Sequence, residues 1–185
     1  MNDYLLPLIF SVIAGVCLHA GFNHFFIARK NTKDRVNLSF SIACFLAAVY
    51  VIFDLNTLKA ETIPFYVFMV KGQDTFHGLF QMAMLWFVAY YTGIIPGRFI
   101  ILLNILWVGE ITTNLIEPYG IAYSHIGKVG SSTLLWGEQI RHITGEPNSL
   151  LLYVYIMIIA NYLTYFYCAI TTYLKGKRYE GRTII

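Results

Sequence analysis

Long apolar runs separated by short polar segments dominate this chain. Residues 4–28, 36–55, 99–116 and 149–174 are apolar runs close to the ~20 residues that an α-helix needs to cross a bilayer. A fifth segment, 63–95, is equally long but has a polar stripe in its first half. The pattern predicts an all-α integral membrane protein: a bundle of five transmembrane helices that forms a single domain over residues 1–185.

The segment 63–95 organises the rest of the chain. From Thr75 to Ile95 it has no formal charge if His77 is neutral. Lys71, Asp74, His77 and Gln81 recur at spacings of three and four, which places them on one face of a helix. Unpaired polar groups are costly in hydrocarbon, so this face is expected to point into the bundle.

The connection 118–148 is polar, rich in glycine and too interrupted to span a membrane. Its successive segments YGIAYSHIG, KVGSS and TLLWGEQI predict a β-hairpin that turns at the glycine-serine segment.

Composition agrees with a membrane protein. Hydrophobic residues make up 57% of the chain and charged residues 12%, against about 25% charged in soluble domains. The net charge of +3 is small and dispersed, which argues against nucleic acid as a partner. The three cysteines lie in apolar runs without the spacing of a zinc site, and no metal is expected.

The distribution of lysine and arginine predicts the orientation. One side of a five-span bundle receives nine of these residues: Arg29, Lys30, Lys33, Arg35, Arg98, Lys175, Lys177, Arg178 and Arg182. The other side receives four: Lys59, Lys71, Lys128 and Arg141. We therefore expect the N-terminus outside, the C-terminus in the cytoplasm and the 118–148 loop on the extracytoplasmic side.

Polar side chains gather in the outer half of this bundle, below the loop. They predict an outward-facing polar pocket that binds a small or lipid-like ligand. Its candidate residues are Asp54, Lys71, Asp74, His77, Glu110, Asn114 and Glu117 from the helices, with Trp136 and Glu138 from the loop. The alternative is that these groups pair with one another, as Lys71 and Asp74 can at i, i+3, or lie among the headgroups. Glu110 is the strongest candidate, since a charge near the bilayer midplane is costly.

Three further helix faces combine small and polar residues, as is usual for helix packing in membranes. The first span contributes Ser11, Gly15, His19 and Asn23; the second contributes Asn37, Ser41, Cys44 and Ala48; the fifth contributes Asn161, Thr164, Cys168 and Thr171.

The histidines raise haem as an alternative cofactor, with His19, His24 and His77 as candidate ligands. Bis-histidine ligation needs two imidazoles at one depth, and we expect His19 and His24 in the inner half but His77 in the outer half. No cofactor is therefore the preferred expectation. The chain has no GxSxG, HExxH or phosphate-binding glycine loop, and we expect no enzymatic activity.

Three stretches resemble the N-terminal membrane sensor regions of bacterial signalling proteins, which precede PAS, histidine-kinase or GGDEF modules. They are KNTKDRVNLSFSIACFLAAVYVIFDLNTLKAET (30–62), KGQDTFHGLFQMAMLWFVAYYTG (71–93) and IEPYGIAYSHIGKVGSSTLLWGEQIRHITGEPN (116–148). The resemblance implies a sensory input module in a bacterial inner membrane, whose last helix leads to a cytoplasmic output. The chain ends about ten residues after its last span, so it is either a truncated form or acts through a partner, as a homodimer or with a cytoplasmic signalling protein.

Two hypotheses remain open. The chain is a sensory ligand-binding module of the bilayer, or it is a transporter-like or redox membrane protein that uses Glu110 and His77 as a proton or cofactor site.

Overall fold

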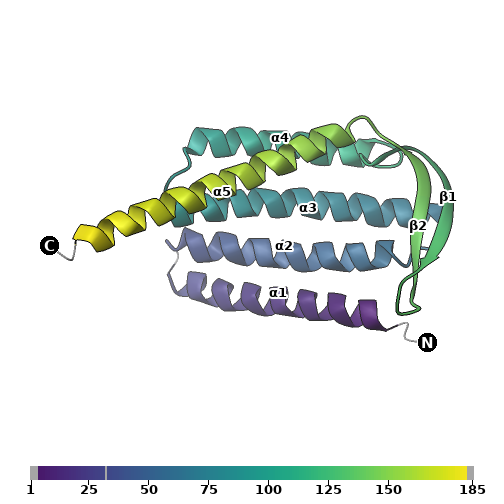
Figure 1. Ribbon diagram of the computed structural model, residues 1–185, viewed down its shortest axis with the longest axis horizontal. Helices are drawn as coiled ribbons and strands as arrows, with labels where there is room; N and C mark the ends of the chain where they lie inside the picture. The colour runs from purple at the N-terminus through teal and green to yellow at the C-terminus, as the bar shows by residue number, and fades with distance from the viewer. Residues whose placement is uncertain (1–3, 32, 183–185) are drawn as a thin grey trace.

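The computed structural model describes residues 4–31 and 33–182. Its elements, in chain order, are α1 (Leu5–Lys30), α2 (Arg35–Thr57), α3 (Ile63–Thr92), α4 (Gly97–Ile116), β1 (Tyr123–Thr133), β2 (Gln139–Pro147) and α5 (Leu151–Arg182). The helices α1 to α4 lie side by side in chain order and run alternately in opposite directions, and α5 crosses them obliquely (Figure 1).

Within residues 4–31 and 33–182, four helices are long and apolar enough to cross a membrane: α1, α2, α4 and the Leu151–Gly176 part of α5. The helix α3 is the longest of the first four, at 30 residues, and lies between α2 and α4 (Figure 1). The polar residues of α3 therefore have neighbouring helices on both sides. A predominantly helical membrane-type fold is confirmed.

The helix ends follow local capping chemistry. The Asp34 side chain accepts a hydrogen bond from the Asn37 backbone N–H and caps α2, and this bond holds the pKa of Asp34 below its ordinary value. Thr62 caps α3 in the same way through the N–H of Phe65. Gly93 ends α3 with φ of 63°, a left-handed conformation that glycine adopts without strain. The helix α5 continues to Arg182, beyond the predicted end at 174, and the side chains of Lys177, Arg178 and Arg182 lie outside the described residues.

The packing of α1 on α2 differs from the prediction. The predicted face of α1, with Ser11, Gly15, His19 and Asn23, is exposed. The buried residues are Ala14, Gly21 and Ala28. A Cβ at Gly21 would lie 2.9 Å from the Phe45 ring, and Ser41 donates to the Gly21 carbonyl at 2.8 Å. The helices α1 and α2 pack at Gly21, which has no side chain and so leaves room for the Phe45 ring of α2. The side chains of α2 therefore decide which face of α1 is buried.

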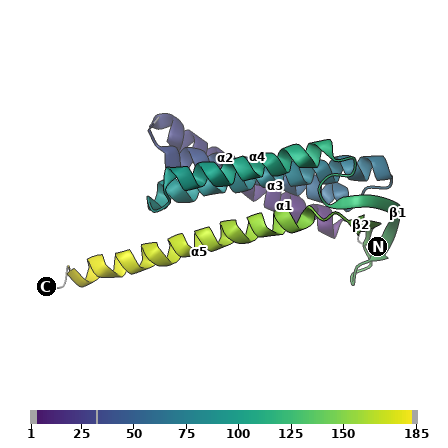
Figure 2. The ribbon, with the colours of Figure 1, turned by 90° about the horizontal axis from the view of Figure 1, so that it is seen from above.

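The apolar core of the bundle lies among α3, α4 and α5. Its buried members are Leu85, Ala89, Ile100, Leu103, Trp107 and Met157. The helix α5 joins the bundle near its N-terminal end and diverges from the other helices toward its C-terminus (Figure 2).

The strands β1 and β2 form the predicted hairpin, but its turn is elsewhere. Gly130, Ser131 and Ser132 pair within the strands, and the turn occupies 134–138. Leu134 and Glu138 close it with a 2.8 Å backbone hydrogen bond, and Gly137 has φ of 88°. A glycine with positive φ suits a tight turn. Gly130 instead lies under the His142 ring, whose Nε2 atom is 2.7 Å from the position that a Cβ of Gly130 would take.

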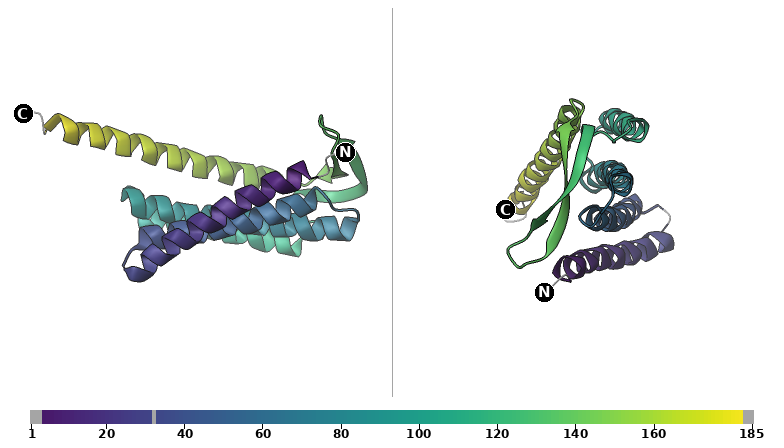
Figure 3. Two further views of the ribbon diagram at one scale, coloured as in Figure 1. Left: turned by 90° about the horizontal axis from the view of Figure 1, so that it is seen from below. Right: turned by 90° about the vertical axis from the view of Figure 1, so that its right-hand side faces the viewer.

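The hairpin lies across one end of the bundle, beside the N-terminus of α1 (Figure 3). We call this the hairpin end, and we call the opposite end, with Lys30, Arg35 and Thr92, the basic end. The Arg141 N–H donates to the Leu58 carbonyl at 2.7 Å, and the Arg141 guanidinium lies 3.9 Å from the Glu61 carboxylate. These contacts attach the hairpin to the connection between α2 and α3.

Candidate functional site

One face of α3 carries a row of polar side chains into the interior of the bundle. Asp74, His77 and Gln81 follow one another at helical spacing on this face. Gln81 is only 2% exposed, and the Asp74 Oδ2 atom is buried. We call this row the α3 stripe, with the adjacent residue Glu110 of α4 as its partner.

Glu110 reaches the α3 stripe because α3 has a glycine opposite it. Glu110 is 1% exposed, and its Oε2 atom lies 3.0 Å from where a Cβ of Gly78 would be. Gly78 is one helical turn after Asp74, so the two carboxyl groups share this part of the interface. Among the described residues, neither Asp74 Oδ2 nor Glu110 Oε2 has a hydrogen-bond partner.

Asn114 connects the structural elements around the half of the site that is nearest the hairpin. Its Nδ2 donates to the Lys71 carbonyl at 2.8 Å and to Thr75 Oγ1 at 3.3 Å, and its Oδ1 accepts from the Ile121 N–H at 3.1 Å. One fully buried amide thus joins α3, α4 and the segment before the hairpin. The Lys71 ammonium donates to the Leu115 carbonyl at 3.2 Å, at the end of α4.

A chain of hydrogen bonds continues from His77 to α5. Gln81 Nε2 donates to His77 Nε2 at 3.0 Å, and Asn161 Nδ2 donates to Gln81 Oε1 at 3.2 Å. Tyr165 donates to the same Gln81 Oε1 at 3.2 Å. An amide nitrogen only donates, so His77 Nε2 accepts in this arrangement. The Trp107 ring meets the His77 ring edge-on, with centroids 5.7 Å apart.

The other predicted residues are placed outside this cluster. Asp54 accepts a 3.0 Å hydrogen bond from Gln73 Nε2 and links α2 to α3. Glu138 is 2% exposed and accepts from the Leu6 N–H at 3.0 Å and from Trp136 Nε1 at 3.1 Å. The Glu138 carboxylate therefore caps the N-terminus of α1, where negative charge is stabilised. Glu117 is the residue directly after α4 and is partly exposed.

Tyr165 and Trp107 contact this network, whereas Gln73 binds Asp54 outside it, and the sequence did not single out any of the three as site residues. Gln73 is adjacent to the polar stripe but on the side of α3 that faces α2. Tyr165 is one of 14 tyrosines, and nothing in its sequence neighbourhood distinguishes it from tyrosines at the surface. Only the packing of α5 brings its hydroxyl to Gln81.

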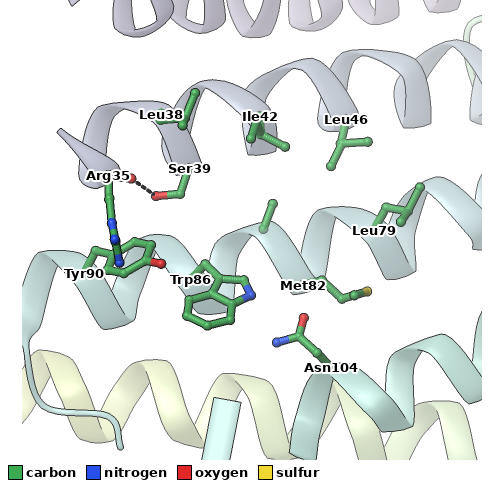
Figure 4. A pocket seen from close by; sticks show the side chains of 11 residues that line it. Arg35, Leu38, Ser39, Ile42, Leu46, Leu79, Met82, Trp86, Tyr90 and Asn104 are labelled. Atoms are coloured by element: carbon green, nitrogen blue, oxygen red, sulfur yellow. Dashed lines mark hydrogen bonds between the residues drawn. The ribbon is translucent and has the colours of Figure 1, made fainter. Parts of the chain in front are cut away.

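A separate groove of about 500 Å³ lies at the other side of α3, toward the basic end (Figure 4). It is mostly apolar and is formed by α2, α3 and α4, with Ile42, Leu46, Met82, Trp86 and Asn104 among its lining residues. The Arg35 guanidinium lies 5.7 Å from the centre of the Tyr90 ring at its rim. The helix α3 thus has a polar face toward α4 and α5 and an apolar face on this groove.

The three histidines proposed for haem lie on two separate helices. His19 and His24 are on α1 and His77 is on α3, and α2 lies between these helices (Figure 1). His19 bonds Asn23, His24 bonds Asn37, and His77 bonds Gln81. Within residues 4–31 and 33–182 no three His, Cys, Asp or Glu side chains are grouped as metal ligands are.

Comparison with known proteins finds no match: no protein-family model, no curated protein and no solved structure is significantly similar to this chain. The geometry of the α3 stripe is therefore the basis for a functional proposal.

Proposed function

We propose that the chain is a membrane-embedded sensory module. A small ligand that offers hydrogen-bond donors binds between Asp74 and Glu110, and its presence is transmitted to α5 through Gln81, Asn161 and Tyr165.

The observation that carries the proposal is a surplus of buried acceptors. Asp74 Oδ2, Glu110 Oε2 and Asn161 Oδ1 are buried and unpaired among the described residues, against Trp107 Nε1 as an unpaired donor in the same region. Buried unpaired acceptors cost free energy, and a buried carboxylate costs more. A ligand with an ammonium group or several hydroxyl groups supplies the missing donors.

The contacts of α5 support a signalling role for this helix. Gln81 receives hydrogen bonds from Asn161 and from Tyr165, one helical turn apart on α5. Toward its C-terminal end α5 diverges from the bundle (Figure 2). If the ligand binds more tightly when the Gln81 side chain has one arrangement than when it has another, ligand binding shifts the equilibrium toward the first arrangement. A small rotation of α5 at Asn161 then moves its C-terminal end.

The proposed placement has five crossings, with the N-terminus and the hairpin outside and the C-terminus in the cytoplasm of a bacterial cell. The alternating directions of the helices and the basic residues at the basic end support it. Cysteines introduced at Ser131 and at Gly176 are expected to react with impermeant reagents from opposite sides of the membrane. Labelling of both from one side would contradict this topology.

Ligand binding is tested by thermal unfolding of the purified protein with a panel of amines, amino acids and polyols. A ligand at a hundred times its Kd raises the midpoint by about 5–10 °C in a chain of this size. Glu110→Gln and Asp74→Asn remove the charges with little change of shape and are expected to abolish that increase. Glu61→Gln makes the same change at an exposed carboxylate and is expected to retain it.

The route through α5 is tested separately. Tyr165→Phe removes the hydroxyl that contacts Gln81 and keeps the ring. The variant is expected to bind the ligand but to lose the ligand-induced change in the labelling rate of a cysteine at Gly176. An equal change in the parent and in Tyr165→Phe would exclude this route.

A transporter-like function is the second candidate, because neighbouring carboxyl groups inside a bundle also suit a proton or cation pathway. Ion-driven uptake into liposomes that Glu110→Gln abolishes would favour it. For the haem alternative, a Soret band in the spectrum of the purified protein would favour the redox hypothesis.

A further inference from the structure

The exposed face of α1 carries polar side chains in the middle of an apolar helix. His19 and Asn23 lie on this face, one turn apart, and Ser11 and Gly15 precede them at the same interval. The structure exposes all four, although α2 buries the opposite face of α1. We call these four residues the α1 stripe.

The depth of the stripe makes its exposure costly. At 1.5 Å per residue, His19 lies about 21 Å along α1 from Leu5, and Asn23 lies about 10 Å from Lys30. Both therefore fall within the ~30 Å hydrocarbon core when α1 crosses a bilayer. Polar side chains at that depth face protein or water, since lipid tails offer them no hydrogen bonds.

The two side chains satisfy each other only in part. Asn23 Nδ2 donates to His19 Nε2 at 2.9 Å. The imidazole is left with its Nδ1–H donor, and the amide is left with its Oδ1 acceptor. Neither forms another hydrogen bond within residues 4–31 and 33–182. The α1 stripe thus presents one donor and one acceptor, side by side.

We infer that the α1 stripe is the interface of a parallel homodimer. A two-fold axis along the membrane normal brings the same depth of two α1 helices together. The His19 Nδ1–H of each copy then donates to Asn23 Oδ1 of the partner, and the arrangement is reciprocal. A second copy pairs both groups on both chains without any further molecule, and this self-complementarity identifies it as the occupant.

The neighbouring small residues allow the close approach that this pairing requires. Apart from its chain neighbours and the backbone of α1, no atom of the described residues lies within 4 Å of where a Cβ of Gly15 would be. Ser11 and Gly15 also border a hollow of about 280 Å³ between α1 and α2, which can receive a partner side chain. Small residues at a spacing of four are common where transmembrane helices meet. They assist the contact, but the His19 and Asn23 groups specify it.

Energy transfer between labelled copies in liposomes, measured at increasing lipid-to-protein ratio, tests the dimer. The parent is expected to show transfer that falls with dilution as a two-copy equilibrium. His19→Phe and Asn23→Leu each remove both reciprocal bonds, which predicts roughly tenfold weaker association. Gly15→Leu fills the contact and is expected to weaken association at least as much.

Matched controls lie on the exposed face of α4. Gly109 also has no atom within 4 Å of its Cβ position, and Thr112 is exposed. Gly109→Leu and Thr112→Val are expected to leave association unchanged. Circular dichroism and the unfolding midpoint verify that each variant is folded.

A mixture of His19→Phe and Asn23→Leu copies tests the reciprocity itself. The mixed pair retains one donor and one acceptor across the interface, so it is expected to associate more strongly than either variant with itself. A monomeric parent, equal weakening by Gly109→Leu, or a mixed pair no stronger than the separate variants would each overturn the inference.

Discussion

The α1 stripe and the α3 stripe share one sequence feature and have opposite positions in the fold. Each is a row of residues at helical spacing that contains a histidine followed four residues later by an amide: His19 and Asn23 in one, His77 and Gln81 in the other. Each histidine also bonds that amide. The α3 stripe is enclosed by α4 and α5, whereas the α1 stripe is exposed at the edge of the bundle.

Position in the bundle therefore decides which partners a polar row meets. In the α3 stripe, Gln81 obtains further partners from α5 within the same chain. In the α1 stripe the remaining groups form no other hydrogen bond within the described residues, and in the proposed dimer they bind a second copy.

The largest difference is expected between Gly78, which lies beside the α3 stripe, and Gly15 of the α1 stripe. Gly78→Leu places a side chain against Glu110 and Ile111, where a Cβ already meets atoms at 3.0 Å. It is expected to destabilise the fold by about 3 kcal/mol, as overpacked core positions do. Gly15→Leu enters open space and is expected to leave the monomer as stable as the parent. Unfolding midpoints in mild detergent compare them, and equal losses would remove the contrast.

The next largest difference in stability is expected between substitutions of Asn114 and of Asn23. Asn114→Ala leaves the Ile121 N–H and the Lys71 carbonyl without their partner inside the bundle, which predicts a loss of about 2 kcal/mol. Asn23→Ala changes an exposed group and is expected to cost less than about 0.5 kcal/mol in monomeric detergent conditions. A large effect of Asn23→Ala on the monomer would mean that α1 uses this side chain within its own chain.

Glu138 tests how firmly α1 is held at the edge of the bundle. Glu138→Ala removes the acceptor for the Leu6 N–H and for Trp136 Nε1, and a loss of about 1 kcal/mol is expected for a helix cap. Glu146→Ala in the same hairpin is the control, since Glu146 is exposed. If Glu138 instead contacts a ligand, the variant would lose ligand response with unchanged stability.

The smallest effect is expected at Asp34, which caps the helix between the two stripes. The bonds from Asn37 lower the pKa of Asp34, so the ionised cap stabilises the fold at pH above the unfolded value of about 3.9. This contribution is lost as the pH falls through the lower folded value. The midpoint difference between the parent and Asp34→Asn is therefore expected to be constant from pH 7 to 5 and to vanish in acid. A difference independent of pH would exclude the ionised cap.

The location of the helices and the existence of the hairpin could be predicted from the sequence because both depend on local patterns. An apolar run of sufficient length forms a helix wherever it lies, and Thr62, Gly93 and Pro96 mark the helix ends by their own backbone preferences. The spacing of Asp74, His77 and Gln81 placed them on one face of α3, and the cost of unpaired polar groups in hydrocarbon predicted that this face points inward. The hairpin turn was misplaced because a glycine at either Gly130 or Gly137 is compatible with a turn, and only strand pairing shows that His142 covers Gly130.

The composition of the candidate site was only partly predictable, since its members come from helices that meet by tertiary packing. The sequence identified Asp74, His77, Glu110 and Asn114, and could not exclude Glu138, which caps α1 instead of facing the site. It could not identify Tyr165 or separate the two polar rows. Spacing along one helix determines which side chains share a face. Which face is enclosed depends on the packing of Phe45 against Gly21 and of Glu110 against Gly78. These contacts form only when the helices come together.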